Sequence, residues 1–104
     1  MLTSSKKRFT LAWSRAEAAE CLGTFLLTFT VSVSLIATLP LPTPLVAALT
    51  VALLVYTIGS ISGAHMNPAV TLGMLSINKM KTDAAVRYLI AQAIGAGLAM
   101  LAVT

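Results

Sequence analysis

The chain has 104 residues and a formal net charge of +4, with 58% apolar and 10% charged residues. A soluble domain carries about 25% charged residues, so this composition excludes an ordinary soluble domain and favours a lipid-facing surface. The length fits one domain, and the single Cys21 excludes an internal disulfide.

The basic residues flank apolar stretches and do not form one basic surface. Four basic residues precede the first apolar stretch: Lys6, Lys7, Arg8 and Arg15. Three follow the third apolar stretch, which lies within 69–77: Lys79, Lys81 and Arg87. This distribution argues against nucleic acid as a partner. It is typical of the positive-inside rule, which places the N-terminus in the cytoplasm. The lipid bilayer of the cell membrane is therefore an expected partner.

The first predicted element is a membrane span over about 15–39, preceded by a cytoplasmic segment over 1–14. Its apolar part, 21–39, is long enough to cross the roughly 30 Å hydrocarbon core as a helix. The apolar run is too long for a signal peptide and no cleavage site follows it, so the span is expected to remain uncleaved. Three prolines at alternate positions within 40–44 end the helix.

A second span is predicted over about 45–61, where Gly and Ser residues stop the helix. A re-entrant loop and half-helix are predicted over about 62–77. Asn67 is a good N-cap, and Pro68 suits the first helical position. About ten residues at 1.5 Å each reach only half-way across the bilayer. The segment must therefore enter and leave on one side, or lie buried against the other helices.

A third span is predicted over about 83–103, capped by Asp83 or Thr82. With the N-terminus inside, the first span leaves the cytoplasm, the second returns, and the half-helix dips in from the cytoplasmic side. The third span then leaves again. All seven basic residues lie inside in this topology, and the chain is expected to stop at the outer surface with Thr104.

The half-helix carries the most distinctive chemistry in the sequence. Its N-terminus points toward the membrane centre and bears about half a positive charge. The side-chain amide of Asn67 can donate hydrogen bonds there to a water or alcohol oxygen, while the helix end disfavours cations. One His, one Cys and three acids show no nucleophile–base or metal-ligand spacing, so neither an enzyme nor a cofactor is expected.

Three stretches resemble the aquaporin and glycerol facilitator family, also called the major intrinsic proteins. The first signature loop resembles SGAHMNPAVT at 62–71, the opening helix resembles AECLGTF at 19–25, and the third helix resembles YLIAQAIGA at 88–96. The resemblance extends from about Ala12 to Val103. It implies an all-α membrane protein with three transmembrane helices plus one re-entrant half-helix, which is one aquaporin-like repeat. The implied function is a passive channel for water and/or small uncharged solutes such as glycerol.

The resemblance also implies roles for individual residues. The pore motif would be Asn67, Pro68 and Ala69, and the carbonyl ladder that solutes pass along would be Gly63, Ala64, His65 and Met66. Glu20 would be the buried carboxylate that accepts backbone amides of the loop, and Gln92 would support the loop from the third helix. Ala47, twenty residues before Asn67, would be a filter position, and its small side chain implies a wider filter.

Two departures from the family pattern bear on function. Ser60 stands where a His often follows the glycine at the end of the second helix. The sequence contains no second Asn-Pro-Ala loop and no filter arginine after one. Arg87 cannot replace that arginine, because it belongs to the cytoplasmic start of the third helix. Exclusion of ions therefore cannot be assumed.

One half-repeat cannot enclose a pore, so a homo-oligomer is expected. Three arrangements remain open: antiparallel dimers of half-repeats, grouped four-fold or not; a parallel oligomer with a central pore; or pairing with a separate second half. The family's two repeats are inverted relative to each other, whereas the basic residues favour a single orientation. The alternative function is a non-conducting half-channel subunit or fragment that associates with another aquaporin half or a complete channel.

Several further patterns concern packing. A polar stripe recurs every four residues on the first helix, and it can line a pore or join helices: Glu20, Thr24, Thr28 and Ser32. A ridge of small residues on the third helix predicts a helix contact: Ala91, Gly95 and Ala99. Trp13, Tyr56 and Tyr88 are predicted interfacial anchors. The side chain of His65 is expected to brace the loop in preference to gating it.

Overall fold

A computed structural model describes residues 12–104. Within this range the chain forms four helices and no strand: α2 (Arg15–Ile36), α3 (Thr43–Ser62), α4 (Pro68–Ser76) and α5 (Thr82–Val103). The prediction of an all-α fold is confirmed. Lys6, Lys7, Arg8 and most of the predicted segment 1–14 lie outside the described residues.

Helix α2 begins with a capping box. The Ser14 hydroxyl accepts a hydrogen bond from the N–H of Ala16 (3.3 Å), and the Ser14 N–H donates to the carboxylate of Glu17 (2.7 Å). These contacts satisfy N–H groups that the first turn of a helix leaves without partners. The helix ends at Ile36, earlier than the predicted residue 39, and Thr38 then adopts a φ of 54°.

Helix α3 is followed by a C-cap residue in the left-handed conformation, which glycine adopts without strain. Gly63 has a φ of 87°, and its N–H donates to the carbonyl of Gly59 (2.8 Å). This is a common way to end a helix, because glycine has no Cβ to clash in the left-handed region. At the other end, Pro44 lies in the first turn, where a missing N–H costs little.

Helix α5 starts differently from the prediction. Lys81 occupies the N-cap position without a side-chain capping bond, so neither Asp83 nor Thr82 caps this helix. Asp83 instead lies in the first turn, where its carboxylate accepts a hydrogen bond from Arg87 (3.0 Å). An acid there still interacts favourably with the positive end of the helix.

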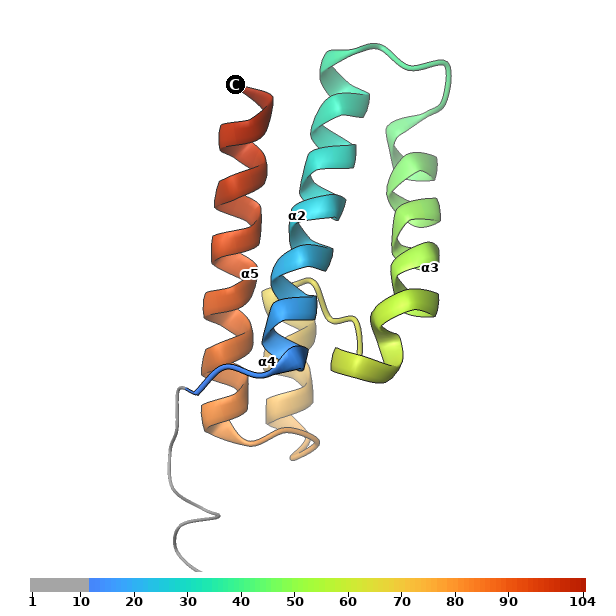
Figure 1. Cartoon of the computed structure of the whole chain (residues 1–104). Coiled ribbons are helices and arrows are strands. Elements are labelled where there is room, and N and C mark those ends of the chain that lie inside the picture. The colour runs from blue at the N-terminus through green and yellow to red at the C-terminus, as the bar shows by residue number, and fades with distance from the viewer. Residues whose placement is uncertain (1–11) are drawn as a thin grey trace, which may run out of the picture.

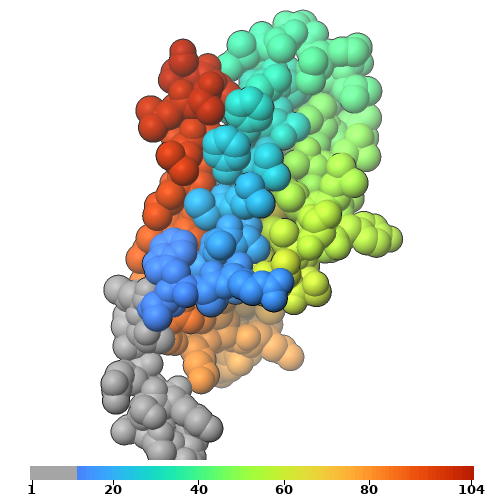
Figure 2. All heavy atoms as spheres, viewed as in Figure 1, coloured from blue at the N-terminus to red at the C-terminus, as the bar shows by residue number. Residues whose placement is uncertain are grey.

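The three long helices lie side by side, and the chain folds back between α3 and α4 (Figure 1). Helix α2 packs against both α5 and α3, and α4 packs against α5. After α3, the chain rises again beside the lower part of α2 before α4 descends. Helix α4 therefore starts within the length of the bundle and ends near the start of α5. Figure 2 shows the side chains of α2 filling the strip between α5 and α3 on this face.

The three long helices have the length and composition of membrane spans. They contain 22, 20 and 22 residues, and between 22% and 28% of each apolar window is buried inside the chain. Most of their apolar surface is therefore available to lipid or to another protein. The nine residues of α4 reach only about 14 Å, which is less than half of a hydrocarbon core of about 30 Å.

Small residues allow α2 and α5 to approach each other closely. Ala91 and Ala99 are each 0% exposed. Gly95 has no room for a side chain, because an added Cβ would collide with the backbone carbonyl oxygen of Cys21 on α2. The ridge predicted from these small residues is confirmed as a helix contact.

Candidate functional site

The N-terminus of α4 presents an exposed asparagine. Asn67 occupies the N-cap position, and its Oδ1 accepts a hydrogen bond from the N–H of Ala69 (2.7 Å). Because Oδ1 faces the helix, the Nδ2 group remains as a donor. Pro68 is the first helical residue. The amide and the positive end of the helix together form a place that favours an oxygen atom and disfavours a cation.

The loop before α4 has an unusual backbone conformation. The φ angle is positive at Gly63 (87°), Ala64 (51°) and Met66 (53°). Residues with a Cβ rarely adopt such angles, and they persist only where the surrounding structure stabilises them. The four residues 63–66, predicted as a carbonyl ladder, therefore form a non-helical segment that needs support from outside.

Glu20 on α2 provides much of that support. Its carboxylate is 0% exposed and accepts the backbone N–H groups of His65 (2.9 Å) and Met66 (2.8 Å). It also accepts hydrogen bonds from the Ser62 hydroxyl (2.7 Å) and from Nε2 of Gln92 (3.0 Å). A buried carboxylate is costly unless it is hydrogen-bonded, so the loop and Glu20 stabilise each other.

Gln92 connects the carboxylate to α4. Its Nε2 donates both to Glu20 (3.0 Å) and to Oγ1 of Thr71 (2.9 Å). Thr71, in the first turn of α4, also lies 3.0 Å from Nδ1 of His65. Gln92 and Thr71 are 1% and 0% exposed. Together with Ser62 at the end of α3, these contacts bring all four helices and the loop into one buried hydrogen-bond network.

Sequence reasoning did not assign Ser62, Thr71 or Tyr88 to this network. Tyr88 is no interfacial anchor: it is 7% exposed, its hydroxyl donates to the Ser62 carbonyl (2.7 Å), and its ring centroid lies 5.0 Å from that of His65. The available signal was spacing, because Tyr88 precedes Gln92 by four residues and therefore shares its helix face.

A second link between α2 and α5 involves charges. Nε of Arg87 donates to Glu17 (3.1 Å), which is 1% exposed, and Nη1 of Arg87 donates to Asp83 (3.0 Å). Arg87 is therefore a structural residue as well as part of the charge asymmetry. Within residues 12–104, no group of three or more His, Cys, Asp or Glu side chains is placed to hold a metal ion.

Two residues singled out in the sequence lie apart from the network. Ala47 is half-buried in the second turn of α3, fifteen residues before Ser62, which is about 22 Å along a helix. Any narrowing at Ala47 is thus separate from the end of α3 that joins the network. Ser60 is exposed in the last turn of α3.

The polar stripe on α2 does not form one open surface. Thr24 is 6% exposed, and its Oγ1 has no hydrogen-bond partner in the part of the chain that the structure describes. Thr28 and Ser32 are half-buried. At Glu20 and Thr24, the stripe belongs to the packing between helices.

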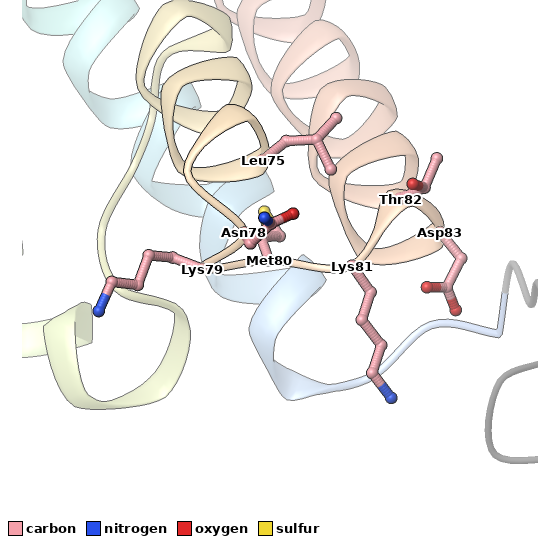
Figure 3. A pocket seen from close by; sticks show the side chains of 7 residues that line it. All are labelled: Leu75, Asn78, Lys79, Met80, Lys81, Thr82 and Asp83. Atoms are coloured by element: carbon pink, nitrogen blue, oxygen red, sulfur yellow. The ribbon is translucent and has the colours of Figure 1, made fainter.

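Two hollows lie away from the loop. One, of about 660 Å³, lies at the α4–α5 turn and is lined by Leu75, Asn78, Lys79, Met80, Lys81, Thr82 and Asp83. Figure 3 shows the side chains of Lys79 and Lys81 pointing away from each other, so they do not converge on one ligand position. The second, of about 500 Å³, is lined by residues of 14–16 and 60–61. Neither hollow is lined by Asn67.

Comparisons with known proteins agree on one family. The sequence pattern of the Major intrinsic protein family matches residues 6–104. Similar proteins include Aquaporin NIP1-1 of Arabidopsis thaliana, 40% identical over 89 residues, and Aquaporin Z of Photorhabdus laumondii, 38% identical over 93 residues. The Glycerol uptake facilitator protein-like 6 of Lactiplantibacillus plantarum is 42% identical over 91 residues.

These matches cover most of this chain but less than half of each relative. They span 78%, 82% and 86% of the chain, and 30%, 40% and 42% of the respective relatives. The match therefore corresponds to part of each relative.

Proposed function

Because the chain belongs to the major intrinsic protein family, we propose that it supplies one half of the wall of a passive membrane channel. The solutes are water or small uncharged molecules such as glycerol. The observation that carries this proposal is the start of α4: Asn67 presents its amide there, while Glu20 holds the preceding loop against α2. We place the N-terminus on the cytoplasmic side of the cell membrane. In this topology the basic residues near the N-terminus and those around the start of α5 lie on that same side.

Selection by this wall rests on hydrogen bonding. Nδ2 of Asn67 donates to the oxygen of a passing solute, and backbone carbonyls of 63–66 accept its hydrogen atoms. Irregular backbone at membrane depth is tolerated where it lines a wet cavity, which suits this loop. Pro68 and Ala69 keep the start of α4 compact, so another half-helix can approach it. A cation meets the positive end of α4 and is disfavoured.

The wall needs a second half, since Asn67 lies on an exposed surface of the single chain. We propose a homo-oligomer in which two copies face each other across their α4 N-termini, with further grouping of these pairs, four-fold or otherwise. Ala47, near the start of α3, then borders an opening of the channel that its small side chain leaves wide. Labelling a tag on each terminus from outside intact cells tests the arrangement: antiparallel copies expose some of each tag, and parallel copies expose only one.

Stopped-flow swelling of proteoliposomes tests the channel. The purified chain should raise water or glycerol permeability above that of protein-free vesicles. Asn67→Ser retains an N-cap acceptor, because a hydroxyl replaces the amide oxygen, but it removes the amide donor. It should lower glycerol flux about fivefold, the effect of roughly 1 kcal/mol in one hydrogen bond. Asn78→Gly, which removes an exposed amide at the other end of α4 where φ is 60°, should leave the flux unchanged.

No flux from well-folded chains would refute the channel for the homo-oligomer. The chain would then act as a non-conducting subunit that associates with a separate half or a complete channel. Conductance across planar bilayers extends the test, because ionic current would show that this wall does not exclude ions. We expect no current under voltage, because a passing cation meets the positive end of α4.

A further inference from the structure

The buried network forms a chain of hydrogen bonds that ends at the only histidine in the sequence. Glu20 Oε1 lies 3.0 Å from Gln92 Nε2, which lies 2.9 Å from Thr71 Oγ1, which lies 3.0 Å from His65 Nδ1. The donors and acceptors along this chain can be assigned from one end.

The assignment starts at Glu20. Its carboxylate faces two backbone N–H groups, of His65 and Met66, which can only donate. Glu20 therefore acts as an acceptor, and the atom of Gln92 that faces it must be the nitrogen. A reversed amide would place Oε1 of Gln92 against a carboxylate oxygen. Consistent with this orientation, Oε1 is the atom of Gln92 without a partner among the described residues.

The assignment continues through Thr71. The same Gln92 nitrogen donates its second hydrogen to Thr71 Oγ1 (2.9 Å), so the hydroxyl acts there as an acceptor. Thr71 is 0% exposed, and the other side-chain contact of its hydroxyl is Nδ1 of His65. A buried hydroxyl hydrogen without an acceptor is unfavourable, so Thr71 donates to Nδ1.

A neutral imidazole that accepts at Nδ1 carries its hydrogen on Nε2. Nε2 lies beside the exposed Gly63: a Cβ added to that glycine would be 3.2 Å away. On the other side, the Tyr88 ring packs against the imidazole at a centroid distance of 5.0 Å. The ring is thus fixed in orientation by Thr71 and Tyr88.

We propose that Thr71 is a positioning residue that sets the tautomer of His65. Its hydroxyl donates to Nδ1, so that Nε2–H becomes a directed donor beside Gly63 for the oxygen atom of a passing water or alcohol. The contact with solute rests on the proposed channel function, whereas the tautomer rests on the hydrogen-bond network alone.

Nitrogen NMR tests the tautomer without any assignment problem, because His65 is the only histidine. In bicelles, the ¹⁵N-histidine-labelled chain should show one protonated and one unprotonated ring nitrogen. The protonated nitrogen should couple to both carbon-bound ring hydrogens, which identifies it as Nε2. A protonated Nδ1, or two averaged signals from a freely exchanging ring, would overturn the proposal in the unmodified protein.

Two variants separate positioning from packing. Thr71→Val keeps the shape but removes the hydroxyl, and it should shift both nitrogen signals toward averaged positions. Thr71→Ser keeps the hydroxyl and should retain the separated signals. Unchanged signals in a folded Thr71→Val would overturn the proposal. Should that variant not fold, the unmodified chain still tests the proposal, because a protonated Nδ1 cannot accept the Thr71 hydroxyl and would overturn it.

Flux measurements on the same samples test the solute contact. Thr71→Val should lower glycerol flux severalfold, and Thr71→Ser should restore it. Equal flux in the two variants would overturn the solute contact. A fixed Nε2–H tautomer in a chain that conducts nothing would overturn the channel and leave the positioning role of Thr71 supported.

Discussion

The two ends of the helix bundle are held together in different ways. At the end where α2 and α5 begin, side chains that are buried, or half-buried in the case of Arg87, form hydrogen bonds between elements: Glu17, Glu20, Ser62, Thr71, Arg87, Tyr88 and Gln92. At the opposite end, the described residues show one such bond, between Ser34 and Thr43 (2.9 Å). Other hydroxyls there bond within their own helix, as Thr30 does to the carbonyl of Leu26.

This difference follows from what each end must position. The first end contains a loop with strained backbone, which requires partners from several helices. The second end contains regular helices that satisfy their own backbone groups and present apolar side chains outward, and its loop has a positive φ at Thr38 alone. We therefore expect substitutions in the network to affect both folding and flux, and substitutions at the opposite end to affect folding slightly.

The largest effect is expected for Glu20→Gln. In either orientation, the new NH₂ group faces a backbone N–H, of His65 or of Met66, and a buried acceptor is lost. We expect the free energy of unfolding to fall by about 4 kcal/mol and the flux to be lost. Unfolding in mixed detergent micelles measures the first, and vesicle swelling the second.

The control for this variant lies one helical turn away. Thr24 is also buried, but its hydroxyl has no partner among the described residues. Thr24→Val should leave stability unchanged or raise it, because an unsatisfied hydroxyl is replaced by a methyl group. Equal losses for the two variants would show that burial at this end, and not hydrogen bonding to the loop, determines stability.

The next effect concerns the contact between α2 and α5, which extends from the network toward the opposite end. Gly95→Ala places a Cβ against the carbonyl of Cys21 and should lower the free energy of unfolding by about 2 kcal/mol. Gly97→Ala meets no atom within 4 Å and should raise it by about 0.5–1 kcal/mol, because alanine favours helices. The same unfolding titration compares them, and similar values would contradict the close contact.

A smaller effect is expected for Ser62→Ala. The Ser62 hydroxyl donates to Glu20 (2.7 Å) and accepts the N–H of Ala64 (3.1 Å). Its removal leaves the carboxylate with fewer donors and the N–H without its partner, at a cost of about 1.5 kcal/mol. Glycerol flux should fall as well, since the loop loses one of its supports. A variant with unchanged stability would contradict the importance of this bond.

The smallest effect is expected for Ser34→Ala, the matching hydroxyl at the opposite end. Ser34 and Ser62 are similarly buried, at 5% and 7% exposure. Loss of the single bond to Thr43 should cost about 0.6 kcal/mol, the average for hydrogen bonds between membrane helices. Flux should not change. If Ser34→Ala were as harmful as Ser62→Ala, the distinction between the two ends would be wrong.

Much of the fold was predictable because its signals are local. Hydrophobic length predicted three spans, the stretch rich in Gly and Ser predicted the end of α3, and Asn67 with Pro68 predicted the start of α4. Helix α2, however, ends at Ile36, before the prolines that were expected to stop it. The cap of α5 was not predictable in this way. Asp83 and Thr82 are both suitable residues, but the helix starts with Lys81 at the N-cap position, and Asp83 bonds to Arg87 from within the first turn.

The site was predictable where a resemblance named residues, and less so where packing decides. Glu20 and Gln92 were singled out by position in the sequence, but their contacts with Ser62 and Thr71 join elements 21 to 42 residues apart. Tyr88 was misinterpreted because tyrosines near span ends also serve as interfacial anchors. The hydroxyl of Tyr88 bonds to the Ser62 carbonyl, and this partner is known only once the loop is placed in the fold.

The position of Glu20 has a consequence for biosynthesis. The carboxylate lies on α2, which is synthesised before its partners Ser62 and Gln92, 42 and 72 residues later in the chain. An acidic side chain within a lipid-inserted helix is costly until it is hydrogen-bonded, even near the start of the helix where Glu20 lies. A nascent chain must therefore keep α2 near the water interface or the translocon until α5 is made. Helix α5 thus completes the hydrogen bonds of a helix made before it.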